Sequence, residues 1–284
     1  MRKKIYIIIA ILTTLFVMPD CDKIEEPFFE DGVTVWNGRK ILIYDFTGHK
    51  CGNCPRAHKL LENFKSRYGD AVVPIAIHAT FFAMPQDQAD GKFSYDFRTD
   101  IGDILGGRGL STDCYYGELY LPTGLVNNLS KNALMSDNQW AEQVEKYLPL
   151  FPEFEIRIKN SYCPQEKSII TEINIETLIE NNRNLHLNVF VTEDEIKQWQ
   201  EDYLQTPSAI ENYVHNHVLR GGFVGAFGEA VNENNNSLNI GKTIRKEYSL
   251  VMEKDWVKEN CSVIAFVYDY DNKEVMQTEI KKFP

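Results

Sequence analysis

The stretch Ile41–Cys54 reads ILIYDFTGHKCGNC and joins an apolar run to two cysteines that are separated by two residues. The apolar residues 41–46 predict a buried strand, and an amphipathic segment begins at Cys54, so the two thiols lie at a strand-to-helix junction. This spacing allows the thiols to close into a disulfide. Free amides at the start of a helix favour a thiolate, which makes Cys51 the candidate nucleophile.

Periodicity beyond the cysteines predicts a helix followed by a second strand. The apolar residues at helical spacing are Ala57, Leu60, Leu61, Phe64 and Tyr68. We expect Gly69 to end this helix, because glycine adopts the backbone conformation of a helix C-terminus without strain. The run Val72–His78 reads as another buried strand. The order strand, helix, strand is typical of a βαβ unit with a parallel sheet.

A long insertion, Thr80–Leu119, separates this unit from the next predicted strand, and we expect it to form a helical cap beside the dithiol. Leu121-Pro122-Thr123 reads as a turn into that strand. A closing helix is predicted from Asn138, and the proline-rich segment Pro149–Pro152 marks a domain boundary. The first domain is therefore assigned to residues 32–150.

Residues 153–284 have the pattern of a second, all-β domain. Seven short segments alternate or are apolar: Phe154–Lys159, Ile169–Glu176, Leu185–Val191, Tyr213–Arg220, Ile244–Met252, Val263–Tyr270 and Glu274–Ile280. Short strands in this number predict an antiparallel, immunoglobulin-like β-sandwich. Thr192–Glu195 fits a capping box, which predicts a short helix through Leu204 between two of the strands.

The N-terminus predicts export. Basic residues precede an apolar stretch, Ile5–Met18, and Cys21 follows it directly. Residues 1–20 read as a signal peptide. We expect Cys21 to carry a lipid anchor and residues 21–31 to form the tether, with an ordinary signal peptide and an unmodified Cys21 as the alternative.

The charge and the cysteines bound the function further. Without residues 1–20 the chain has 27 Lys+Arg and 40 Asp+Glu, a net charge of −13, which argues against nucleic acid as a partner. Export implies an oxidising compartment. Three cysteines remain besides the anchor and the dithiol: Cys114, Cys163 and Cys261. Cys163 and Cys261 are the candidates for a structural disulfide, which would leave Cys114 as a free thiol or a third redox partner, although sequence does not fix the pairing.

In these segments the chain resembles the thioredoxin superfamily. The apolar strand 41–46, the dithiol Cys51–Cys54 and the Leu121-Pro122-Thr123 loop match, in order, the central strand, the active-site dithiol and the cis-proline loop of that fold. The resemblance implies an α/β thioredoxin-like domain with a helical insertion. It also implies that Asp45 is a buried acid that exchanges a proton with Cys54.

The resemblance gives each residue of the site an expected role. Cys51 attacks a substrate disulfide, and Cys54 then attacks Cys51 to release the substrate. Lys50 and His49 are expected to stabilise negative charge on Cys51. A cis Pro122 would turn the backbone of Leu121 towards an extended peptide. The Gly52-Asn53 spacer between the cysteines does not indicate whether the activity is that of a reductase, an oxidase or an isomerase.

Other interpretations of these residues stay open. The dithiol can be an inert structural disulfide or half of a metal site, since His58 could add a third ligand to Cys51 and Cys54, but no second dithiol completes it. We therefore predict no metal and no cofactor. Asp45 can be a polar strand-end residue that does not titrate near neutral pH. In a single strand, His215 and His217 would point the same way and could bind a ligand together, or could simply lie on a half-exposed face.

The whole mature chain resembles the twenty-eight-kilodalton outer-membrane lipoprotein family of Bacteroides-like bacteria. The stretches that carry the likeness are the lipoprotein-like start, CGNCP at 51–55, LPTG at 121–124 and YVHNHVLR at 213–220. This implies a lipid-anchored protein of the outer membrane, on its periplasmic face or on the cell surface. Two functions remain: thiol-disulfide exchange with thiol- or disulfide-containing exported proteins, or non-catalytic surface binding and adhesion on a thioredoxin-like scaffold.

Overall fold

The computed structural model describes residues 38–232, 237–253 and 255–283. The predicted signal peptide, Cys21 and the tether lie outside these residues. No helix in the described part of the chain is long and apolar enough to cross a membrane.

The first half of the fold forms around two parallel strands, β1 (Ile41–Thr47) and β2 (Val72–His78), which are joined by helix α1 (Cys54–Tyr68). Every residue of both strands is buried, as their continuous apolar runs require. Gly69 caps the helix with a φ of 55°, so the predicted helix end is confirmed.

Strand β3 (Thr123–Val126) pairs antiparallel with β1, and the short β4 (Met135–Ser136) continues the sheet. Helix α3 (Trp140–Tyr147) follows and supplies the fully buried Trp140. Together with α1 it packs on the face of the sheet that carries Ile41 and Ile43. The opposite face carries Leu42, Tyr44 and Phe46, and that face belongs to a different hydrophobic core.

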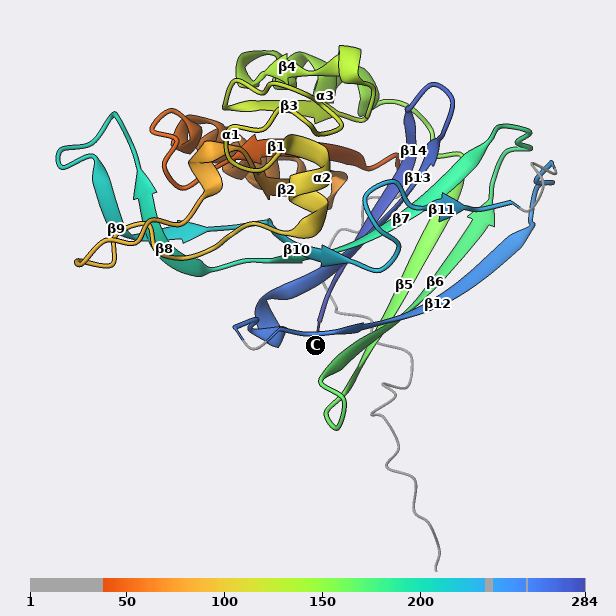
Figure 1. Cartoon of the computed structure of the whole chain (residues 1–284). Coiled ribbons are helices and arrows are strands. Elements are labelled where there is room, and N and C mark those ends of the chain that lie inside the picture. The colour runs from red at the N-terminus through yellow and green to blue at the C-terminus, as the bar shows by residue number, and fades with distance from the viewer. Residues whose placement is uncertain (1–37, 233–236, 254, 284) are drawn as a thin grey trace, which may run out of the picture.

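Strands from both halves of the chain form one sheet (Figure 1). Among the described residues its order is β14-β13-β7-β10-β2-β1-β3-β4, with β11 (Glu229–Ala230) beside β7. The strands of the second half are β7 (Leu185–Glu193), β10 (Val218–Gly222), β13 (Cys261–Asp269) and β14 (Val275–Lys282). The sheet therefore runs across the predicted boundary near residue 150.

A second layer covers the far end of this sheet. Its strands are β5 (Phe154–Cys163), β6 (Ser168–Thr177) and β12 (Thr243–Val251), which pair antiparallel with one another. Apolar side chains of this layer meet those of β7, β13 and β14 in a continuous core. The predicted fold class is thus confirmed as a mixed, sheet-rich architecture with few helices.

The predicted helix through Leu204 is wrong. Residues 196–215 instead form a hairpin of β8 (Ile196–Glu201) and β9 (Ala209–His215), which projects to the left in Figure 1. Glu195 has a φ of 63°, which interrupts the helical path that the capping box suggested. His217 has a φ of 59° and divides the predicted strand 213–220 into β9 and β10.

The insertion between β2 and β3 is less helical than predicted. It contains α2 (Asp100–Gly106), which packs against β2 and β10, and a 3-10 turn at Phe81–Ala83. The predicted helical cap on the dithiol is replaced by this short turn, whose Phe82 carbonyl accepts a hydrogen bond of 3.1 Å from the Lys50 amide.

Gly124 in β3 provides a test of the packing around the first sheet. A Cβ atom there would lie 2.2 Å from the Tyr44 carbonyl oxygen and 2.5 Å from the Trp140 ring. We expect Gly124→Ala to lower the free energy of unfolding by about 2–4 kcal/mol, because backbone and a buried indole would have to move. Urea denaturation measures this change.

Gly221→Ala is the matched control, since a Cβ at this strand position has its nearest neighbour at 3.5 Å. It should cost less than about 1 kcal/mol. Equal destabilisation by the two variants would contradict this account of the packing.

Candidate functional site

The two cysteines form a disulfide in the loop that joins β1 to α1. The Cys51 amide donates to the Gly48 carbonyl at 2.9 Å, and the Cys54 amide donates to the Cys51 carbonyl at 3.2 Å, which tightens the loop before the first helical turn. Cys51 is 3% exposed and Cys54 is fully buried. The pair is therefore placed as predicted, but it is not open to solvent.

The proline loop lies at the same end of the sheet. The Leu121–Pro122 peptide bond is cis, as predicted. Thr123 follows at once and pairs with Phe46 near the end of β1, so the loop faces the segment that leads to the disulfide. Leu121 is half-buried and packs on the core beneath.

Asp45 is fully buried in the middle of β1. Neither carboxylate oxygen has a hydrogen-bond partner in the described part of the chain. Burial raises the pKa of this carboxyl to about 8, and the negative charge of Asp137 adds a smaller rise. Asp45 therefore carries a proton at neutral pH and titrates just above it, which argues against the interpretation that it never titrates near neutral pH.

His49 does not have the predicted role of a positive charge beside Cys51. Its ring is fully buried, contacts the edges of Phe93 and Phe97, and lies 3.2 Å from the Met84 carbonyl oxygen. Burial lowers the pKa of His49 to about 4, so the imidazole is neutral at physiological pH. The Lys50 ammonium lies 4.1 Å from the centre of the Phe81 ring, in a cation–π contact.

The β8–β9 hairpin covers the disulfide loop. The Tyr203 amide donates to the Gly52 carbonyl at 2.9 Å, and the Glu201 amide donates to the His49 carbonyl at 2.8 Å. The buried Gln200 side chain donates to the Cys51 carbonyl at 3.0 Å. The Tyr203 ring packs so closely that a Cβ on Gly52 would lie 2.4 Å from it. This cover explains the burial of Cys51.

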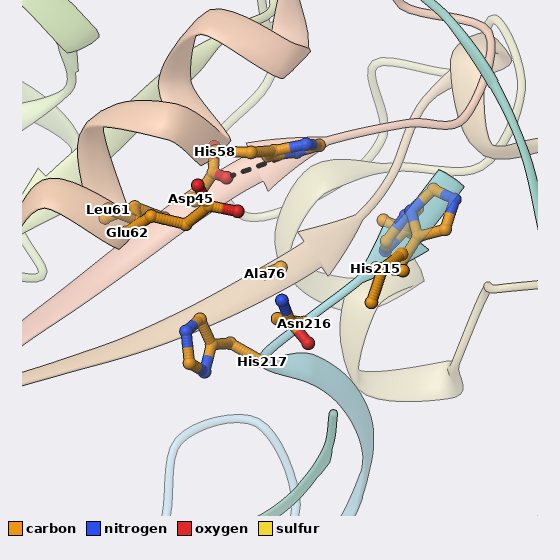
Figure 2. Close-up of a pocket in the computed structure, with 10 residues that line it drawn as sticks. Asp45, His58, Leu61, Glu62, Ala76, His215, Asn216 and His217 are labelled. Carbon is orange, nitrogen blue, oxygen red and sulfur yellow. Dashed lines mark ion pairs between the residues drawn. The ribbon is translucent and has the colours of Figure 1, made fainter. Parts of the chain in front are cut away.

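Four of the six histidines in the chain line a small pocket beside Asp45 (Figure 2). Its ionisable lining residues are Asp45, His58, Glu62, His78, His215 and His217. The predicted pair does not point the same way: Figure 2 shows the rings of His215 and His217 directed to different sides. No group of three ligating side chains in the described ranges could hold a metal ion.

The predicted structural disulfide is wrong, because Cys163 and Cys261 are both free thiols. Cys163 ends β5 in the smaller sheet, whereas Cys261 begins β13 in the larger one. Each thiol has its own acceptor: Gln165 for Cys163 and the Val257 carbonyl for Cys261. Cys114 is also free, half-buried, and donates to the Gly117 carbonyl.

Comparison with known families decides the relationship of the chain. Residues 111–283 match the family described as "Outer membrane protein Omp28". The chain belongs to this family. The match confirms the predicted resemblance and the predicted location in the outer membrane. It does not include the disulfide, which precedes the matched residues. None of the functionally curated proteins matches the chain.

Solved structures add a likeness of fold. HBP35 of Porphyromonas gingivalis superposes with a TM-score of 0.58 at 14% identity, covering 87% of this chain and 76% of its own. An Agrobacterium tumefaciens protein has a TM-score of 0.49 at 11% identity, covering 87% of this chain and 96% of its own. A domain of the outer membrane lipoprotein Omp28 from Porphyromonas gingivalis has a TM-score of 0.33 at 23% identity, covering 46% of this chain and 88% of its own.

Sequence reasoning missed the hairpin cover and the contacts of His58. Ile196 and Trp199 are the apolar residues of segment 196–201, so no regular alternation indicated a strand there, and the capping box determined the prediction. No local pattern indicated that Tyr203 would lie on Gly52, because the two residues are far apart in the sequence.

Removing the Tyr203 ring should open the disulfide. In Tyr203→Ala we expect the rate of reduction of Cys51–Cys54 by a water-soluble phosphine to rise about tenfold, the effect of losing roughly 1.4 kcal/mol of closing free energy. Alkylation of the released thiols followed by mass spectrometry measures this rate. Leu204→Ala is the control, since Leu204 is adjacent but 83% exposed. Wild-type rates in both variants would disprove the cover.

Buried neutral histidines should make the protein acid-labile. Burial lowers the pKa of His49 and His58 to about 4 and that of His215 to about 3. Below pH 6.5 the unfolded chain binds protons at these residues and the folded chain does not. The free energy of unfolding therefore falls as the pH decreases from about 6.5 towards 4, by about 1.4 kcal/mol per pH unit for each histidine. Asp45 has the opposite effect. Its pKa is raised in the folded chain, so over this pH range the folded chain binds a proton at Asp45 that the unfolded chain does not, and this contribution to the free energy of unfolding does not fall as the pH decreases.

Thermal unfolding between pH 4 and 7 tests this linkage. His215→Phe should make the pH dependence shallower by about 1.4 kcal/mol per pH unit. His186→Gln, at a half-exposed position on β7, should change it less. An unchanged slope in His215→Phe would contradict a neutral buried His215.

Proposed function

We propose that this outer-membrane protein is a lipoprotein anchored through Cys21 that performs thiol-disulfide exchange on exported proteins. In this proposal residues 32–150 form a thioredoxin-like domain and residues 153–284 form an immunoglobulin-like β-sandwich, and the two share the large sheet. The partners are thiol- or disulfide-containing proteins outside the cytoplasm.

The observation that carries the proposal is the placement of Asp45. A buried carboxyl with a pKa of about 8 lies in the strand that leads directly to the disulfide, and a cis-proline loop flanks the same end of the sheet. A structural disulfide needs no proton carrier, whereas an exchanging disulfide does, because each cysteine alternates between thiol and disulfide.

The chemistry balances with the residues present. The reduced protein attacks a substrate disulfide through the Cys51 thiolate, and one substrate sulfur leaves as a thiolate. Cys54 gives its proton to the carboxylate form of Asp45, which a pKa of about 8 makes the minor form at neutral pH, and attacks Cys51, which re-forms the Cys51–Cys54 disulfide and releases the second substrate sulfur. The substrate disulfide is reduced by two electrons and the protein is oxidised by two. The reverse sequence oxidises a substrate dithiol.

The proline loop suits a peptide substrate. Pro122 has no N–H, so in this proposal the backbone of Leu121 is the group that pairs with an extended chain. The backbone amides of the hairpin already donate hydrogen bonds to the carbonyls of His49 and Gly52. A substrate therefore requires the hairpin to lift from the disulfide loop.

Trapping tests the proposal. In cells that produce Cys54→Ser, the mixed disulfide at Cys51 is not resolved, so we expect adducts with exported proteins on non-reducing gels. The double variant Cys51→Ser/Cys54→Ser should give none, and Cys114→Ser should behave as wild type. If Cys54→Ser traps no partner, exchange with exported proteins is refuted.

The burial of Cys51 favours a second candidate, a non-catalytic surface binding or adhesion protein that uses the thioredoxin-like domain as a scaffold. Here the hairpin would seal the disulfide permanently, as the hydrogen bonds from Gln200, Glu201 and Tyr203 to the disulfide loop suggest. Cells carrying Cys51→Ser/Cys54→Ser would then keep wild-type surface binding and tolerance of redox stress. A strong redox-stress phenotype would exclude this candidate.

A further inference from the structure

His58 occupies a chemically suggestive position between Asp45 and the surface. It lies on α1, one helical turn after Cys54. Its Nε2 atom is 2.9 Å from the Thr47 hydroxyl and 3.7 Å from Asp45 Oδ2, the contact that Figure 2 marks with a dashed line. Its Nδ1 atom is 2.8 Å from the Tyr213 hydroxyl, which β9 supplies. One ring nitrogen thus faces the buried carboxyl and the other faces the hairpin.

The space beside this pair holds little more than one water molecule. The pocket next to Asp45 and His58 has a volume of about 20 Å³. A pocket of this size and polarity fits a proton path, since it is too small for an organic ligand.

Asp45 needs such a path. Its carboxyl is fully buried and does not touch solvent directly. Each reduction or re-formation of the Cys51–Cys54 disulfide consumes or releases a proton at Cys54. A carboxyl that supplies this proton must be recharged from outside before the next cycle.

We propose that His58 and Tyr213 relay the proton between Asp45 and solvent whenever the Cys51–Cys54 disulfide is reduced or re-formed. The relay rests on the proposed thiol-disulfide exchange, and it assigns His58 and Tyr213 as positioning residues that act through Asp45. During reduction, an external dithiol supplies two electrons that break the S–S bond. The Cys54 thiolate takes the Asp45 proton, Asp45 takes one from His58, His58 takes one from Tyr213, and the Tyr213 oxygen takes one from solvent.

Neutral imidazole suits this task. It accepts a proton on one nitrogen and releases one from the other, so no lasting charge forms in the buried site. Burial and, to a smaller extent, the nearby His217 lower the pKa of His58 to about 4, which keeps the ring neutral at physiological pH. Thr47 holds the orientation of the ring from β1.

Other ionisable groups surround the relay without replacing it. Burial raises the pKa of Tyr213, and the negative charges of Glu62, one turn further along α1, and Asp202 add smaller rises. His217 lies 3.1 Å from Asp194. His78 and His215 flank Phe97, at 4.2 and 4.6 Å between ring centres. Among the described residues, these contacts leave His58 as the histidine that meets both Asp45 and Tyr213.

The test uses the mature full-length protein and dithiothreitol as the reductant, so it does not depend on any protein substrate. The rate of Cys51–Cys54 reduction is followed from pH 6 to 10 by rapid alkylation and mass spectrometry. In His58→Gln, which keeps a polar side chain without a proton-relaying ring, we expect the rate to fall about tenfold or more and its pH dependence to change. Tyr213→Phe keeps the ring packing and should reduce the rate in the same direction.

Chemical rescue separates a relay from a structural role. Free imidazole should restore part of the rate in His58→Gln and should not affect wild type. His186→Gln, at a distant histidine, should behave as wild type with and without imidazole. The relay is overturned if His58→Gln retains the wild-type rate and pH profile, or if its rate falls without any rescue. If the relay passes these tests and Cys54→Ser still traps no cellular partner, the proposed protein substrates are refuted and the relay is not.

Discussion

The pairing of β10 with β2 is the constraint on which the rest of the structure depends. The Ala76 amide donates to the His217 carbonyl at 2.8 Å, and Val218 lies opposite Ala76 in parallel register. Because β9 directly precedes β10 in the chain, this pairing brings the β8–β9 hairpin to the end of the sheet where the disulfide lies. The same pairing brings Tyr213 to His58. The second half of the chain thereby completes the site of the first.

A shared aromatic core stabilises this arrangement. Tyr44 of β1 lies 6.4 Å from Phe190 of β7 and 6.2 Å from Phe266 of β13, measured between ring centres. All three rings are almost completely buried. Aromatic side chains of this size contribute strongly to burial, and edge-on contacts add to it. The two halves are thus joined by side-chain packing as well as by the backbone, which explains why a boundary in the sequence pattern is not a boundary in the sheet.

Local patterns predicted local structure well. The apolar run of β1 and the helical spacing of α1 follow from residues that are close in sequence, whereas the cis bond before Pro122 was expected from the resemblance to the thioredoxin superfamily. The features that sequence did not reveal depend on distant contacts. A capping box at Thr192–Glu195 predicted a helix, yet pairing between residues 196–201 and 209–215 made a hairpin, since tertiary context overrides local propensity. The cysteine count likewise suggested a disulfide between Cys163 and Cys261, whereas the structure places these two free thiols in different sheets.

The shared sheet also constrains how an outer-membrane protein of this kind is assembled. In an exported chain that enters the periplasm N-terminus first, β2 arrives well before β10. Until then one side of β2 presents unpaired N–H and C=O groups along an apolar strand, which is a template for pairing with other chains. In such a chain this edge of the first half lacks its partner until β10 arrives, so self-association of the edge has to be avoided until then.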